Sequence, residues 1–101
     1  MKKASKRVQR VLTDHDEIQE WAESRSAHPA CVKGTEDKTG SCLLRLDFPG
    51  YSGDESLHAI PWDQWFRVLD QRKLALVVED KMADGSSSNF NKLVSREAVQ
   101  A

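Results

Sequence analysis

The sequence predicts a small α+β domain, in which two amphipathic helices pack on one face of a mostly antiparallel sheet. Three observations predict this class. Two segments carry apolar residues at helical spacing, strand-like segments occur in two pairs, and the order along the chain is α-β-β-α-β-β. The expected architecture is a two-layer sandwich over residues 13–96, between a basic flexible N-terminal tail (1–12) and a C-terminal tail (97–101).

The first helix is expected to begin near Asp14. Asp14 and Glu17 form an acidic capping pair, which satisfies free backbone N–H groups and complements the helix dipole. The apolar stripe of this helix, at i, i+3 and i+4, consists of Ile18, Trp21 and Ala22. Because a residue that precedes proline avoids the helical region, the helix should end before the segment Ser26–Pro29.

A β-hairpin is expected next, from a short strand over residues 30–33 and a second strand over 42–48. The second strand alternates, and its core-facing positions are Cys42, Leu44, Leu46 and Phe48. If Val32 shares this core face, Cys42 lies on it while Cys31 points to the opposite face. The sequence therefore predicts two buried or half-buried thiols rather than a disulfide.

The second helix has the plainest pattern in the chain. Its apolar stripe, at i, i+3, i+4 and i+7, consists of Trp62, Trp65, Phe66 and Leu69. Pro61 stands at or near the first helical position, where proline is favoured. A continuous apolar run at 74–78 and a segment at 90–95 then predict two further strands, with the turn signal Asp84-Gly85 between them.

Composition and motifs exclude several classes of protein. No apolar run approaches the ~20 residues of a membrane span, and the basic N-terminus lacks the apolar stretch of a secretory signal. We therefore expect a cytoplasmic protein that does not enter membranes. The cysteines form no CxxC pair and the histidines are scattered, so we expect no metal and no cofactor. Helix capping explains the acids around His15, and no activated nucleophile or phosphate loop is visible, so we expect no catalytic residue.

The loop over residues 49–58, between the second strand and the second helix, is the candidate binding site. The loop is rich in glycine, proline and acids, and its Tyr51 is the aromatic residue that we expect to be exposed. Asp54 and Glu55 are the other expected contacts. These residues favour a non-catalytic protein-interaction module, which binds a protein partner through this face.

Two alternatives remain open. The net charge is −1, yet residues 1–13 carry five cations and no acid, so the remainder carries −6 and the tail could associate with nucleic acid. The cations of this tail are Lys2, Lys3, Lys6, Arg7 and Arg10. Lys92 and Arg96 would add to such a surface, or would only deter pairing at a sheet edge. The weaker alternative is carbohydrate binding, because acids and aromatic residues also occur together in sugar sites.

A resemblance is carried by TDHDEIQEWAESR (13–25), VKGT (32–35), LRLDFPGYSGDESL (44–57), WDQWF (62–66), LALV (74–77) and ADGSSSNFNKLVSR (83–96). With these segments the chain resembles a family of small bacterial proteins of unknown function, many of them labelled "1,4-alpha-glucan branching enzyme". The chain departs from the family at Pro61, where relatives tend to carry a serine that would cap the second helix. Branching activity does not follow from the label, because those enzymes use a (β/α)₈ barrel of about 250 residues.

Overall fold

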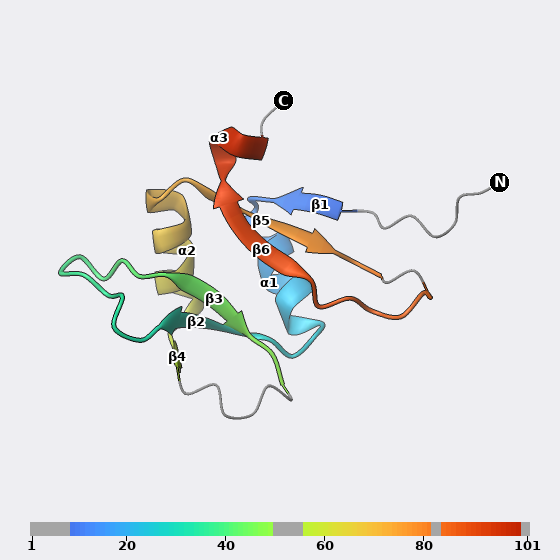
Figure 1. The fold of residues 1–101 in the computed structure, drawn as a ribbon, viewed down its shortest axis with the longest axis horizontal. Coiled ribbons are helices and arrows are strands. Elements are labelled where there is room, and N and C mark those ends of the chain that lie inside the picture. Colours follow the sequence, from blue (N-terminus) through green and yellow to red (C-terminus); the bar gives the residue numbers. More distant parts are fainter. Residues whose placement is uncertain (1–8, 50–55, 82–83, 100–101) are drawn as a thin grey trace.

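A computed structural model describes residues 9–49, 56–81 and 84–99 of the chain. In this part the chain forms two three-stranded antiparallel sheets and three helices, which confirms the α+β class (Figure 1). None of the helices found there is long and apolar enough to cross a membrane.

The first sheet has the strand order β1-β5-β6, from β1 (Gln9–Leu12), β5 (Leu74–Glu79) and β6 (Asn91–Ser95). All its pairs are antiparallel, with Leu76 of β5 opposite Leu12 on one side and Leu93 on the other. As the central strand, β5 is buried over almost its whole length, which explains its continuous apolar sequence.

The second sheet has the order β3-β2-β4, from β2 (His28–Val32), β3 (Leu44–Asp47) and β4 (Leu57–Ala59). β2 and β3 are the predicted hairpin. β4 overlaps the end of the predicted loop over residues 49–58, and it pairs with the other edge of β2. With only three residues and no clean alternation in burial, β4 gives no strand signal in the sequence.

The helices follow their sequence signals. α1 (His15–Glu23) begins as predicted, because Asp14 Oδ1 accepts a hydrogen bond of 3.1 Å from the Glu17 backbone N–H. α2 (Trp62–Gln71) starts after Pro61, which occupies the N-cap position without any side-chain hydrogen bond. α3 (Arg96–Val99) is a single short turn with no buried residue.

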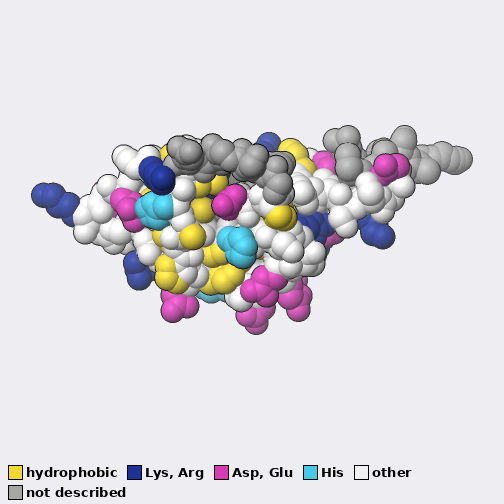
Figure 2. Space-filling view, turned by 90° about the horizontal axis from the view of Figure 1, so that it is seen from below, with side chains coloured by type: hydrophobic (Ala, Val, Ile, Leu, Met, Phe, Trp, Pro, Cys, Tyr) yellow, Lys and Arg dark blue, Asp and Glu magenta, His cyan; other side chains and the backbone are white. Residues whose placement is uncertain are grey.

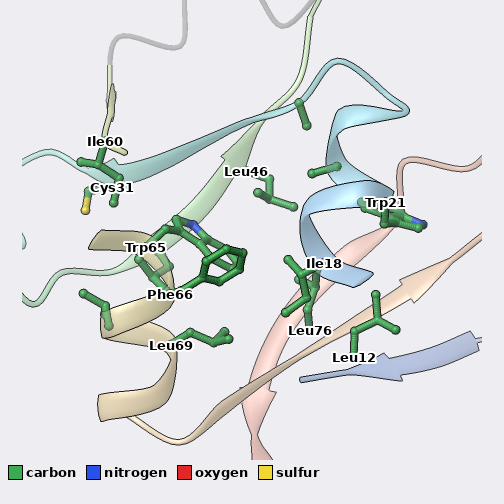
Figure 3. Close-up of a cluster of buried hydrophobic side chains, with 14 of the residues drawn as sticks. Leu12, Ile18, Trp21, Cys31, Leu46, Ile60, Trp65, Phe66, Leu69 and Leu76 are labelled. Atoms are coloured by element: carbon green, nitrogen blue, oxygen red, sulfur yellow. The ribbon is translucent and has the colours of Figure 1, made fainter. Parts of the chain in front are cut away.

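One hydrophobic cluster joins the two helices to both sheets (Figure 3). Trp65 of α2 lies at its centre, fully buried, and its indole Nε1 donates a hydrogen bond of 3.0 Å to the Arg45 carbonyl. Trp62 stacks on Phe66 with ring centroids 5.1 Å apart. Ile18 of α1 is also fully buried in the same cluster. The aromatic stripe of α2 is therefore core, as the spacing predicts.

The ordered domain extends past the bounds expected from the sequence. Residues 9–12, placed in the tail, form β1, and residues 97–99, placed beyond the domain, belong to α3. β1 was missed because three of its four side chains are exposed and only Leu12 is buried, so the strand has no apolar alternation.

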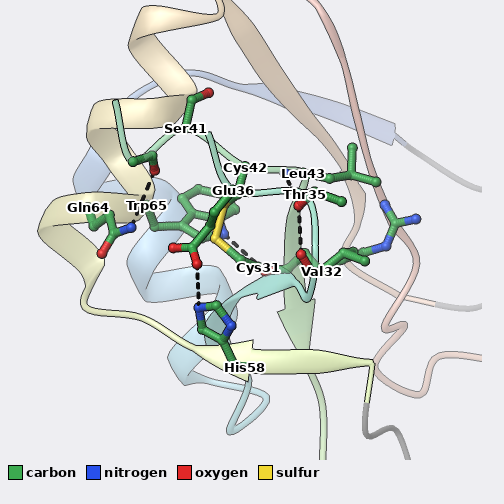
Figure 4. Close-up of a disulfide and its surroundings, with 12 residues drawn as sticks. Cys31, Val32, Thr35, Glu36, Ser41, Cys42, Leu43, His58, Gln64 and Trp65 are labelled. Atoms are coloured by element: carbon green, nitrogen blue, oxygen red, sulfur yellow. Dashed lines mark hydrogen bonds and ion pairs between the residues drawn. A yellow bond between two sulfur atoms is a disulfide. The ribbon is translucent and has the colours of Figure 1, made fainter. Parts of the chain in front are cut away.

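Cys31 and Cys42 form a disulfide, so the prediction of two separate thiols was wrong (Figure 4). The error lies in the face assigned to β2. Cys31 is fully buried and stands opposite Leu44 in the ladder, so Cys31 rather than Val32 shares the core face with Leu44. β2 is a central strand with buried residues on both faces, which removes the alternation that a parity argument needs.

Candidate functional site

The residues predicted to bind a partner fall into two groups. Tyr51, Asp54 and Glu55 of the 49–58 loop lie outside the described residues, as do Lys2, Lys3, Lys6 and Arg7 of the tail. The described ones are Arg10 on β1, Lys92 on β6 and Arg96 at the start of α3.

Arg10 is engaged in a bidentate ion pair. Its Nε and Nη2 donate to the two carboxylate oxygens of Asp80 at 2.7 and 2.9 Å. The hydrogen bonds from Arg10 lower the pKa of Asp80 below its ordinary value, and partial burial opposes them only in part. This pair fastens β1 to the end of β5, so Arg10 has a structural role.

Arg96 also holds elements of the fold together. Its Nε donates to the Leu74 carbonyl at 2.8 Å and its Nη2 to Asp70 Oδ1 at 2.7 Å. The second oxygen of Asp70 lies 2.9 Å from His15 Nε2, and the His15 ring stacks on Phe66. Partial burial alone would raise the pKa of Asp70, but the hydrogen bonds from Arg96 and His15 lower it overall. Arg96 therefore has a structural role, and it is not among the residues that line the hollow beside Lys92.

Lys92 belongs to a different arrangement, a groove between the edges of the two sheets. Within the described chain, β3 has only β2 as a neighbour and β6 has only β5. The two edge strands run beside each other in Figure 1, and a hollow of about 290 Å³ lies between them. Its lining residues are Leu44, Arg45, Leu46, Phe48, Asn89, Asn91, Lys92 and Leu93. We call this hollow the interedge groove.

The backbone on both sides of the interedge groove points into it. Val32 N–H donates to Leu43 O, so β3 turns the backbone groups of residues 43, 45 and 47 toward β2. The intervening residues Leu44 and Leu46 direct their N–H and C=O groups away from β2. Glu79 N–H donates to Phe90 O, and the same alternation along β6 directs those of Asn91 and Leu93 away from β5. Two open strand edges thus face the same space.

The side chains give the interedge groove an apolar floor and a positive rim. Leu44, Leu46 and Phe48 are buried, whereas Arg45 and Lys92 are exposed. Among the described residues that line the groove, the charged ones are these two cations. The groove is at the small end of the size range of ligand sites.

Sequence reasoning identified Lys92 but missed Arg45 and the leucines as parts of one site. The alternation of β3 predicts that Arg45 lies on the outer face. A cation at position 92 is typical of an edge strand. No sequence pattern shows that β3 and β6 are edge strands of two different sheets, or that both line one hollow although 44 positions separate Asp47 from Asn91.

Comparison with known proteins returned no relative: no family model, curated protein or solved structure matches this chain. Its function is therefore argued from the geometry of the described residues.

Proposed function

We propose that this protein is a non-catalytic interaction module that binds an extended, acidic segment of a partner protein in the interedge groove. The observation that carries the proposal is the pair of open strand edges, β3 and β6, which face one hollow from opposite sides. Extended peptides commonly bind by adding a strand to such an edge, and here both edges of the added strand would find hydrogen bonds.

The length of the segment follows from the strands. β3 has four residues and β6 has five, so a partner strand of about five residues matches both edges. Backbone groups of Leu46 on one side and of Leu93 on the other would pair with it. Its side chains would alternate between the apolar floor and the rim, where Arg45 and Lys92 favour acids.

The chemistry of the lining supports binding rather than catalysis. The interedge groove is lined by leucines, a phenylalanine, asparagines and two cations, with no carboxylate, histidine or thiol among them. The described lining residues thus offer neither a general acid or base nor an activated nucleophile. Binding of a partner is the activity that these residues support, and we place it in the cytoplasm as part of the proposal.

The test is selection from a display library of random extended peptides, followed by fluorescence anisotropy with the enriched sequences. We expect enriched peptides to alternate apolar and acidic residues and to bind with micromolar Kd. The double variant Arg45→Glu/Lys92→Glu should lose about tenfold in affinity, because each exposed ion pair contributes at most about 1 kcal/mol. Amide exchange at Leu46 and Leu93 should slow when peptide is bound, since their N–H groups would become strand hydrogen bonds.

The matched control is Lys33→Glu/Lys38→Glu, which makes the same change in charge at two exposed lysines outside the groove. This variant should bind the peptides as the unmodified protein does. If both double variants bind the peptides equally weakly, the loss of affinity comes from the change in net charge and not from the groove. If no peptide is enriched, or if the amides are not protected, strand addition is refuted.

Nucleic-acid association is the second candidate, because the formal charges of the groove lining are all positive. It predicts binding to single-stranded oligonucleotides that weakens steeply between low and moderate salt. The same pair of charge-reversed variants tests it, since only Arg45→Glu/Lys92→Glu should abolish the binding.

A further inference from the structure

One corner of the second sheet gathers a cysteine sulfur, an imidazole and a carboxylate. Ligand atoms of Cys31, Glu36 and His58 all lie within 4.8 Å of one another. Cys42 Sγ is bonded to Cys31 Sγ, so a second sulfur lies one bond length from this set (Figure 4). We call these four residues the Cys-His-Glu corner.

The fold itself positions these groups. Cys31 on β2 and His58 on β4 are direct partners across the ladder, so their side chains project from the same face. Glu36 comes from the loop between β2 and β3, and its Oε1 lies 3.7 Å from His58 Nε2. The side chains of His58 and Glu36 are 35% and 42% exposed, whereas both cysteines are fully buried. The corner therefore has a buried sulfur side and an open side that an ion can enter.

The loop that carries Glu36 is held by hydrogen bonds that do not involve the disulfide. Thr35 Oγ1 donates to Val32 O at 2.6 Å and accepts from the Leu43 backbone N–H at 2.9 Å. Asp37 Oδ1 accepts from Thr39 and from the Ser41 N–H, and the hydrogen bonds from Thr39 lower the pKa of Asp37. When the disulfide opens, these hydrogen bonds would still hold the loop that carries Glu36 and leads from Cys31 on β2 to Cys42.

We propose that reduction of the disulfide converts the Cys-His-Glu corner into a zinc site. A phosphine reductant and one water give the phosphine oxide as the S–S bond breaks, and Cys31 and Cys42 become thiols, which release their two protons to solvent when they bind zinc as thiolates. With neutral His58 and the Glu36 carboxylate they form a four-ligand set of the kinds that zinc prefers. The soft thiolates and the imidazole favour zinc over calcium or magnesium, which take oxygen ligands.

The distances among Cys31, Glu36 and His58 require only a small contraction, while the two sulfurs, bonded in the disulfide, would move apart once it is reduced. Ligands at 2.0–2.3 Å from one tetrahedral ion are roughly 3.5 Å apart, compared with the 4.8 Å limit that encloses Cys31, Glu36 and His58. The half-exposed side chains of His58 and Glu36 are free to make that movement. Figure 2 shows the molecule of Figure 1 from below, and on this face histidine and acidic side chains are open to solvent.

The disulfide and the zinc ion would each hold the loop between β2 and β3, but not at the same time. A disulfide oxidant such as oxidised glutathione takes two electrons from the two thiolates. The Cys31–Cys42 bond then forms, two glutathione thiolates leave, and the zinc ion is released. The chain would bind metal in a reducing compartment and hold a disulfide in an oxidising one.

The experiment titrates Co²⁺, a spectroscopic substitute for zinc, into the full chain with and without a phosphine reductant. We expect the reduced protein to bind one ion, with a thiolate-to-cobalt charge-transfer band and the intense visible bands of a four-coordinate ion, and zinc to displace it. The oxidised protein should bind at least a hundredfold more weakly, because both sulfur ligands are then missing. Absence of the charge-transfer band, or equal affinity in both redox states, would refute the site.

Variants identify the ligands. Cys42→Ser cannot form the disulfide and keeps the other three ligands, so it should bind cobalt without any reductant. In the reduced protein, His58→Ala and Glu36→Gln should each weaken binding at least tenfold. Loss of a residue that only supports a metal ligand already costs about tenfold in affinity, and loss of a direct ligand should cost more. The control His28→Ala changes an exposed histidine of the same sheet and should bind normally.

Folding is followed by circular dichroism in the same samples. If the reduced chain or Cys42→Ser loses its structure, zinc should restore the folded signal, since binding and folding are then coupled. A reduced chain that stays unfolded with zinc, or equal binding by His58→Ala and His28→Ala, would overturn the proposal.

Discussion

Opening the Cys31–Cys42 disulfide should cost this protein about 3 kcal/mol of stability. The bond closes a loop with a sequence separation of 11 residues. In the chain-entropy model a crosslink stabilises by restricting the unfolded chain, and a loop of this length corresponds to about 3 kcal/mol at 25 °C. The hydrogen bonds of Asp37 and Thr35 keep the loop in place in the folded state only. They therefore do not replace the constraint on the unfolded state.

The assay is urea unfolding of the full chain, oxidised and phosphine-reduced, with a chelator present so that metal cannot contribute. A loss of about 3 kcal/mol should move the midpoint by about 1–3 M urea and lower the Tm by roughly 10–25 °C. The control Cys31→Ala/Cys42→Ala has no disulfide and should not respond to the reductant. A midpoint that moves by the equivalent of less than about 1 kcal/mol would refute the entropic reasoning. Alkylation of both cysteines in the untreated, unfolded chain would show that the bond is not formed.

Three further predictions concern the core, a half-buried cation and pH. Trp65→Ala should destabilise by about 3–5 kcal/mol in the same unfolding assay, because Trp65 is fully buried at the centre of the core; a loss under 1 kcal/mol would contradict that position. Arg25→Ala should cost about 2–3 kcal/mol, since it strips hydrogen bonds from the Ser88 and Asp80 carbonyls, and Arg25→Lys should recover only part of this loss. The pair with Arg10 lowers the folded pKa of Asp80, so its stabilisation is present above the unfolded pKa of about 3.9. That stabilisation is lost as the pH falls through the lower folded value, and it amounts to no more than about 1 kcal/mol because the side chains are exposed. Asp80→Asn should flatten the stability profile in acid, and an unchanged profile would show that the pair contributes nothing.

The sequence predicted those parts of the fold whose signal is local. The capping pair of Asp14 and Glu17 located α1, and the stripe around Trp65 located α2, because helical spacing reports which side chains face the core. The run at 74–78 located β5, because a strand that is buried on both faces has a continuous apolar sequence.

The parts that escaped prediction depend on contacts between distant segments. β1 is held by its ladder with β5 and by the Arg10–Asp80 pair, 70 positions apart in sequence. Cys31 was assigned to the wrong face because β2 is covered on both sides. The interedge groove depends on β3 and β6, edge strands of different sheets, lining one hollow, and the Cys-His-Glu corner depends on the pairing of β4 with β2. Spacing along the chain contains none of this information.

The pairing of β1 with β5 determines where this chain can be shortened. A version beginning at residue 13, the boundary that the sequence suggests, would lack β1 and leave one edge of β5 uncovered along Leu76, Val77 and Val78. An apolar edge of this kind is a template for pairing with another chain. We expect such a version to self-associate, because residues 9–12 cover this edge in addition to completing the sheet.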